Sequence, residues 1–363
     1  MIHASLYYDI YLLLVTILTI ATYSQYKNRD EIYEVETRRS DILAVLIVVF
    51  MSLFIGLRPL DGRYFGDMAN YAEYYHAFYE GINFVFERNT ENMIFDNLFA
   101  WWGANRFGYT SFFVLLAVIY FGASYWGISK LFPNDRLAAY LVFLAAFSTF
   151  SYSTNGIKAG AAAALFIGAM GVRDNLKICI PLILISWGFH HSMVMPVAAF
   201  IITMFIKNSK LFFALWFFCL IMALGHVTTF AHLFAQATTE QGAGYLLGDA
   251  TGDGTKGGFR FDFILYSSMP VIVGWYVCFK KRLELSDTYI NLLNLYLCLN
   301  GIWMLCMYAS YTNRIAYLSW FLYPIVLIYP FLQEEWGDDR YQKFSYVMLA
   351  HLGFTLFMQI IYY

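Results

Sequence analysis

Long apolar runs separated by short polar segments extend through the whole chain. A helix needs about 20 apolar residues to cross a bilayer, with a usable range of about 17–25. By this measure the pattern predicts about twelve membrane-spanning helices. They lie near residues 5–25, 41–57, 110–129, 137–154, 157–172, 178–190, 192–206, 211–230, 261–279, 287–308, 315–332 and 344–362. The sixth and seventh runs are short and share the turn His190-His191-Ser192, so they form either a tight hairpin or two discontinuous half-helices.

Two longer polar segments, 58–109 and 231–260, connect these runs. In the first, residues 67–80 carry aromatic side chains at helical spacing, which predicts an amphipathic helix with an aromatic face. These side chains are Tyr71, Tyr74, Tyr75 and Phe78. The stretch 92–105 is apolar but too short to span, and we interpret it as a helix lying at the membrane interface. In the second segment, the glycine-rich residues 248–258 predict a flexible loop, with a lid as one possible role.

The composition agrees with a membrane environment. Hydrophobic residues make up 60% of the 363 residues and charged residues 13%, about half the share of a soluble domain. This excludes a soluble enzyme, a disordered chain and a disulfide scaffold. The five cysteines lie in apolar runs without a C-x-x-C pair, so we interpret them as small core or lipid-facing residues. We predict one integral membrane domain over residues 1–363, and the net charge of −2 indicates no general affinity for nucleic acid.

The basic residues indicate the orientation of the spans. When alternate loops are assigned to one side of the membrane, the six short loops on that side hold 15 of the 23 lysines and arginines. Cytoplasmic loops carry such an excess. The pattern therefore predicts that both termini and the long segments 58–109 and 231–260 face outward.

Eight basic residues remain on the outward side, where they are disfavoured. They are Arg58, Arg63, Arg88, Arg106, Lys158, Lys256, Arg260 and Arg314. Several stand at the first or last turn of a predicted span, and arginine binds phosphate through a planar fork. The set predicts an anion site at the outer leaflet. The alternative is snorkelling to lipid phosphates or pairing with outward carboxylates, which we favour for Arg88, Arg106 and Lys256.

The candidates for acid–base chemistry also lie on the outward side. Asp67 follows Gly66 at the start of the predicted 67–80 helix, where it is either an N-cap or a general base. The ordinary pKa of histidine suits proton transfer near neutral pH. His190 and His191 therefore either act in acid–base chemistry or make interfacial hydrogen bonds. Adjacent side chains diverge on a helix, so the pair does not favour a metal site. The outward tyrosines, Tyr71 included, belong to an interfacial aromatic belt or stack on sugar rings.

The sequence lacks a phosphate-loop pattern, because the glycine-rich segment 248–258 does not match G-x-x-x-x-G-K-[ST]. Nucleotide donors are largely cytoplasmic, so transfer chemistry on the outward side needs a substrate activated in advance. A sugar linked to a polyprenyl diphosphate has the expected properties. Its lipid stays in the bilayer while its diphosphate lies at the interface, where arginine and lysine would stabilise it as a leaving group.

Several short motifs occur in a fixed order between residues 50 and 325. Gly56-Leu57-Arg58 precedes Gly66-Asp67 with Tyr71, and Lys158 opens a helix of small residues. The turn His190-His191-Ser192 follows, and then Arg314 with Tyr317 in an R-x-x-Y element. This order resembles the EpsG family of polysaccharide polymerases, which is related in role to the Wzy polymerases. At the position of Lys158 the family tends to carry arginine, and lysine lacks the bidentate fork.

The resemblance implies a GT-C-like glycosyltransferase that polymerises repeat units linked to undecaprenyl diphosphate. It would act on the outer face of a bacterial cytoplasmic membrane, for exopolysaccharide, capsule or O-antigen. Asp67, His190 or His191 would be the base, in a one-step inverting transfer that needs no metal or cofactor. The substrate-binding residues would be Arg58, Arg63, Tyr71, Lys158, Arg260, Arg314 and Tyr317.

Under this hypothesis the partners would be lipid-linked donor and acceptor glycans, membrane lipids and a chain-length regulator. Three alternatives stay open at this point: a glycan ligase, a membrane O-acyltransferase of the same pathway, and a transporter of lipid-linked glycans. A transporter would place charges near the bilayer midplane and would show repeated halves.

Overall fold

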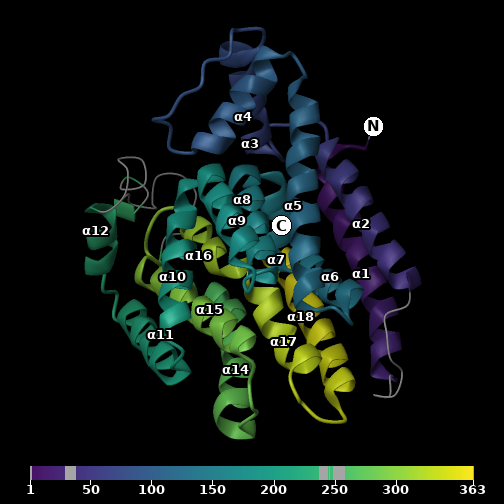
Figure 1. Ribbon diagram of the computed structural model, residues 1–363, viewed down its shortest axis with the longest axis vertical. Coiled ribbons are helices and arrows are strands. Elements are labelled where there is room, and N and C mark those ends of the chain that lie inside the picture. Colours follow the sequence, from purple (N-terminus) through teal and green to yellow (C-terminus); the bar gives the residue numbers. More distant parts are fainter. Residues whose placement is uncertain (1, 29–37, 237–243, 245, 248–257, 363) are drawn as a thin grey trace. The chain divides into compact units, whose positions relative to one another are not determined.

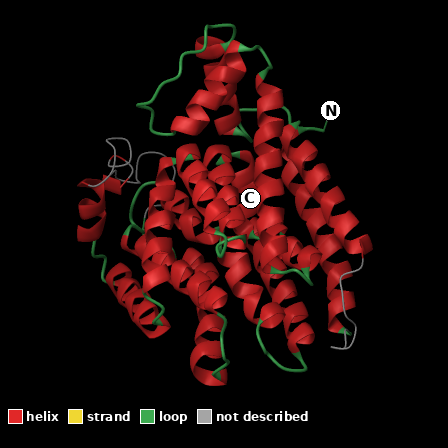
Figure 2. Ribbon diagram, in the orientation of Figure 1, coloured by secondary structure: helices red, strands yellow, loops and turns green. Residues whose placement is uncertain are grey.

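The computed structural model describes residues 2–28, 38–236, 244, 246–247 and 258–362. Within these residues every regular element is a helix, as the apolar pattern predicts (Figure 2). The prediction of a flexible loop at 248–258 falls almost wholly outside them, as does Lys256. The chain divides into two compact units, Met1–Val194 with Phe331–Tyr363, and Met195–Pro330, and each is described by itself.

The first unit holds the N-terminal helices and the C-terminal helix. Its elements are η1 (Ala4–Leu6), α1 (Tyr7–Lys27), α2 (Arg38–Gly56), α3 (Gly66–Tyr74), η2 (Tyr75–Tyr79), α4 (Met93–Ala104), α5 (Tyr109–Leu131), α6 (Arg136–Leu144), α7 (Phe147–Thr154), α8 (Ile157–Gly171), α9 (Leu176–Phe189), η3 (His191–Met193) and α18 (Arg340–Tyr362). The alanine-rich α8 packs against α5 and α9, and α18 packs against α1 (Figure 1). Most side chains of α8 are fully buried, so this helix forms the centre of the unit.

Small residues let α5 and α8 approach closely. A Cβ atom added at Gly127 in α5 would overlap the backbone of Ile167 and Gly168 in α8, and one added at Gly171 would lie 2.6 Å from the carbonyl oxygen of Gly127. Helix interfaces in membranes depend on such close packing, because lipid gives little hydrophobic driving force between helices.

We therefore expect Gly127→Ala to destabilise the protein by about 1–3 kcal/mol, the usual cost of overpacking. The readout is the unfolding midpoint of purified protein in nanodiscs. Gly122→Ala is the matched control on the same helix, because a Cβ there would meet no atom within 4 Å. An equal fall in both variants would contradict the packing argument.

The second unit is built around α15 (Asp287–Leu305). Its other elements are α10 (Val194–Phe205), α11 (Ser209–Leu224), α12 (Thr229–Gln236), α14 (Phe261–Trp275), η4 (Tyr276–Lys281), α16 (Thr312–Trp320) and α17 (Tyr323–Gln333). Buried amides join the helices: Asn300 accepts from Trp216 Nε1 at 2.9 Å and donates to Ser319 Oγ at 3.1 Å. Such polar side chains are the usual interhelical contacts within membranes.

The helices match the predicted apolar runs, with two corrections. Instead of one straight span at 137–154, α6 and α7 meet at a bend of 73°. The predicted span 211–230 is also too long, because α11 ends at Leu224 and the chain turns by 107° into α12. His226 in that turn has a φ of 53°, in the left-handed region.

By length and composition, five of the described helices could cross a membrane, or up to seven if each bent pair counts as one span. Four further apolar helices have 10–17 residues. The structure is therefore that of a helical membrane protein with several spans.

The two further helices predicted within residues 58–109 are present, but their details differ. Residues 67–80 form α3 and the π-helical turn η2, and 92–105 forms α4. The expected single aromatic face is wrong: Tyr71 and Tyr75 pack toward Phe99, whereas Tyr74 and Phe78 are exposed. Pairs four residues apart share a face, and these two pairs lie on different faces.

The N-cap interpretation of Asp67 is also wrong. Phe65 occupies the N-cap of α3, and Asp67 lies inside its first turn. A carboxylate there still interacts favourably with the helix dipole.

Candidate functional site

A cluster of charged and polar side chains lies in the first unit, where α4 packs on α9 (Figure 1). It consists of Glu91, Asn92, Asp96, Lys158 and His191 and is called here the Lys158–His191 cluster. Lys158 Nζ lies 3.8 Å from Asp96 Oδ1, and His191 Nδ1 lies 3.6 Å from Glu91 Oε2. These residues come from the chain before α4, from α4, from the first turn of α8 and from η3. Segments far apart in sequence thus meet at one place.

The contacts of His191 determine which of its ring nitrogens carries the proton. Asn92 Oδ1 accepts the backbone N–H of His191 at 2.9 Å and lies 3.3 Å from His191 Nδ1. An amide oxygen only accepts hydrogen bonds, so a hydrogen bond between these two atoms requires the tautomer that carries its proton on Nδ1. In the neutral ring the lone pair is then on Nε2. This nitrogen can take a proton from a substrate hydroxyl.

The surroundings of His191 keep the ring neutral near pH 7. Burial lowers the pKa of His191 below its ordinary value of 6.5, and the nearby Lys158 ammonium acts in the same direction. The carboxylates of Glu91 and Asp96 oppose both effects and raise the pKa. A neutral imidazole is the form that a general base requires.

His190 has a different role in the same turn. It is the N-cap of η3, and its Nδ1 accepts the backbone N–H of Ser192 at 3.3 Å and lies 2.6 Å from Ser192 Oγ. Its ring stacks on His191 with a centroid distance of 4.9 Å. Because Nδ1 is the acceptor, the neutral ring carries its proton on Nε2. His190 therefore stabilises the turn, and His191 is the better placed base.

Lys158 has mainly acidic and aromatic neighbours. Its ammonium lies 5.0 Å from the centroid of the Phe95 ring, and Tyr71 packs on the same ring at 5.7 Å. Asp96, Glu91 and Asp67 all interact with Lys158 electrostatically. Three carboxylates around one ammonium weaken its attraction for a diphosphate. They favour instead the binding of hydroxyl groups, which can donate to carboxylates.

Arg58 is a buried cation of the same unit. It is 2% exposed, and its guanidinium donates to the carbonyl oxygens of Ile55 and Thr154, both at 2.7 Å. The rings of Phe65 and Phe113 lie at 5.3 and 5.9 Å. Burial lowers the pKa of Arg58 to about 10, so it stays charged at neutral pH. In this arrangement Arg58 ties the end of α2 to the end of α7 and is closed to a ligand.

Arg63, by contrast, is exposed. Its guanidinium lies 5.5 Å from the centroid of the Tyr64 ring, and its backbone N–H donates to Asp61 at 2.9 Å. Its sequence position is close to Asp67, but none of these contacts joins it to the Lys158–His191 cluster.

The remaining sequence-predicted residues belong to the second unit. Arg260 forms a bidentate pair with Asp262, at 3.0 and 2.7 Å, and stacks on Phe263 at 3.5 Å. Its charge is thus already balanced. Arg314, in the first turn of α16, is exposed and lies 4.9 Å from the centroid of the Tyr311 ring. Tyr317 is buried and packs on Trp320 at 5.4 Å.

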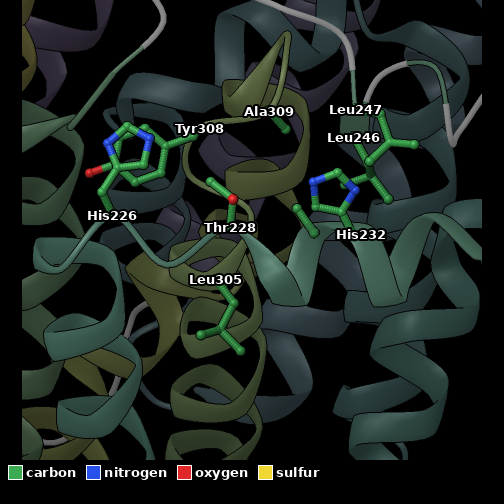
Figure 3. A pocket seen from close by; sticks show the side chains of 9 residues that line it. His226, Thr228, His232, Leu246, Leu247, Leu305, Tyr308 and Ala309 are labelled. Carbon is green, nitrogen blue, oxygen red and sulfur yellow. The ribbon is translucent and has the colours of Figure 1, made fainter.

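The second unit also contains a pocket of about 180 Å³ that the sequence does not predict. His226 and His232 lie on opposite sides of it, with Thr228 between them (Figure 3). The His226 ring stacks on Tyr308 at 3.8 Å, and Tyr308 donates to the carbonyl of Ala223. Leucine and alanine side chains line the rest of the pocket.

Sequence reasoning also missed the roles of Glu91, Asn92 and Asp96 in the cluster. The available signal was a run of polar residues directly before an apolar helix. That pattern by itself indicates only a helix start.

The fold and these sites define a helical integral membrane protein with a half-buried charged cluster in one unit. A family model of the EpsG family matches residues 41–363, and the chain belongs to this family. Family membership connects the protein with polysaccharide biosynthesis and suggests a polymerase for exopolysaccharide. Searches of curated proteins and of solved structures gave no match to this chain.

Proposed function

We propose that this protein polymerises oligosaccharide repeat units carried on undecaprenyl diphosphate, at the outer face of a bacterial cytoplasmic membrane. The chain acts as one GT-C-like membrane domain with about twelve spans, and its product is an exopolysaccharide, capsule or O-antigen chain. Membership of the EpsG family, the apolar helices and the basic residues of alternate loops support this proposal.

The observation that carries the proposal is the geometry of His191. A neutral imidazole, half-buried and with its lone pair on Nε2, is the form of histidine that can take a proton from a sugar hydroxyl. Asp67 and His190 are the other residues proposed from the sequence. Asp67 is the second choice, because its electrostatic interaction with Lys158 connects it to the same cluster. His190 is the third choice, because its Nδ1 already accepts the backbone N–H of Ser192.

The proposed reaction is a single displacement. The acceptor hydroxyl gives its proton to His191 Nε2 while its oxygen attacks the anomeric carbon of the donor. The bond from that carbon to the diphosphate breaks, and its electron pair leaves with the polyprenyl diphosphate. The imidazolium then returns its proton to water. One base and a good leaving group suffice for this step.

The leaving diphosphate develops negative charge, which cationic side chains stabilise. We assign this role first to Arg314 and Arg63, because their guanidinium groups are exposed. Lys158, Arg260 and Arg58 are weaker choices: the first two have carboxylate neighbours, and the third is enclosed. Tyr71, which packs on Phe95, and Tyr317, which packs on Trp320, would support the substrate-binding residues near them. A chain-length regulator is a proposed partner.

The test uses purified protein in nanodiscs with a synthetic polyprenyl-diphosphate repeat unit, EDTA and no nucleotide. Products are separated on gels and identified by mass spectrometry. A ladder of multiples supports the polymerase. Transfer of one glycan to a different acceptor would indicate a ligase, and acylation without a ladder an acyltransferase. Movement of an unchanged unit across the bilayer would indicate a transporter.

A further inference from the structure

We infer that Asn92 and Glu91 form a positioning device for His191, in which Asn92 selects the ring tautomer and Glu91 stabilises the imidazolium formed during transfer. This inference rests on the proposed function, because it gives His191 the role of base. Its first observable, the tautomer, is a property of the resting protein and does not depend on activity.

The side chain of Asn92 is turned away from its usual local role. Asn92 occupies the N-cap of α4, where asparagine normally accepts a backbone N–H of its own helix. Here the side chain makes no capping bond. It is 5% exposed, and its oxygen faces His191, a residue 99 positions further along the chain. The N-terminus of α4 therefore lacks a side-chain cap, and the Asn92 oxygen accepts a hydrogen bond from His191 instead.

This acceptor faces the nitrogen opposite to the reacting one. Asn92 Oδ1 lies 3.3 Å from Nδ1, and Glu91 Oε2 lies 3.6 Å from the same atom. When Nε2 takes a proton, the new positive charge spreads over the ring. A carboxylate next to Nδ1 stabilises that charge, in the way that the third member of a catalytic triad does.

The other charged and titratable groups around His191 determine the direction of the expected pH effects. Glu91 and Asp96 face it from the segment before α4 and from α4, Lys158 from α8, and His190 within its own turn. Removing the Glu91 charge takes away an interaction that favours the protonated ring. The pKa of His191 then falls, and activity persists to lower pH.

Asn92→Ala tests the device, with Asn97→Ala as the matched control. Asn97 is also a buried amide near the start of α4, where it holds the backbone N–H and C=O of Glu87 at 2.8 Å. Loss of either amide loosens the segment before α4, but only Asn92 contacts His191. A merely structural role predicts the same behaviour for both variants.

The first readout is the ¹⁵N spectrum of histidine-labelled protein in nanodiscs, with the His191 signals assigned through His191→Gln. Wild type and Asn97→Ala should show a protonated Nδ1 and an unprotonated Nε2. Asn92→Ala should shift toward a mixture of tautomers, and Asn92→Asp should restore the wild-type tautomer because its carboxylate accepts equally well. An unchanged tautomer in Asn92→Ala would overturn the inference.

The second readout is the pH profile of polymer formation. Asn92→Ala should lower the rate by about 10- to 100-fold, by analogy with the loss of a hydrogen-bond partner that orients a metal-binding histidine. Glu91→Gln should move the acid limb of the profile to lower pH, and Asn97→Ala should leave the limb in place. A limb that stays fixed in Glu91→Gln would overturn the role of Glu91.

The role of His191 as base and the role of Asn92 in positioning it can be tested separately. If His191→Gln retains wild-type polymer formation, His191 is not the base, and the proposed mechanism is wrong even where the tautomer is as expected. If His191→Gln is inactive while Asn92→Ala keeps both tautomer and rate, the base assignment stands and the positioning device is wrong.

Discussion

His191→Gln should lower the rate of polymer formation by about 10²- to 10⁴-fold, the usual contribution of a general base. Glutamine is close to histidine in size, and its side chain can still form a hydrogen bond with Asn92. It has no basic lone pair to accept the proton of an acceptor hydroxyl. The measurement is the initial rate of ladder formation in nanodiscs at pH 7.5.

His190→Gln is the matched control for this prediction. The amide oxygen of glutamine can accept the backbone N–H of Ser192 in place of His190 Nδ1, so the turn should persist. We expect a fall of less than about tenfold, well below the contribution of a general base. The reverse result, with His190→Gln inactive and His191→Gln active, would exchange the two roles. Loss of activity in Asp67→Asn alone would assign the base to Asp67.

The apolar pattern predicts the elements of this fold well and their breaks poorly. Apolar runs define the helices because a segment in lipid must satisfy its backbone internally. The bend between α6 and α7 lies at Ala145 and Ala146, with no proline or glycine there to signal it. Alanine is the best helix former, so local propensity favours continuing the helix. At the bend, the carbonyl oxygens of Phe143 and Ala145 accept from the side-chain hydroxyls of Thr149 and Thr355, at 2.6 and 2.7 Å. Thr355 is 210 residues away in the chain, so the local sequence does not show this contact.

Of the five residues in the Lys158–His191 cluster, the sequence indicates Lys158 and His191 as site residues but does not show what surrounds them. The turn His190-His191-Ser192 is visible in the sequence, yet the tautomer of His191 depends on Asn92, which is 99 residues away. Likewise the sequence predicts Lys158 as a cation for phosphate, and nothing in its own helix shows the carboxylates that interact with it. Long-range contacts decide which of several suitable residues performs a role.

Arg314→Ala should reduce polymer formation by about 10²- to 10³-fold, as does removal of one group that stabilises developing negative charge. Arg314 is exposed, and its guanidinium lies 4.9 Å from the centroid of the Tyr311 ring, a stacking interaction that contributes about 0.5–1 kcal/mol at an exposed site. The protein should therefore still fold and reach the membrane. Arg314→Lys keeps the charge but loses the bidentate fork, so its activity should lie between those of wild type and the alanine variant.

The measurement for Arg314 is the chain-length distribution of polymer in cells that carry only the variant, with membrane protein levels determined by immunoblot. Arg282→Ala is the control, because Arg282 is an exposed arginine of the same unit at the end of η4, on the side predicted to be cytoplasmic. It should give normal polymer. Normal chain length in Arg314→Ala would remove Arg314 from the diphosphate site. A loss of polymer in both variants would indicate a general need for positive charge, because exposed arginines on opposite sides of a membrane cannot bind the same diphosphate.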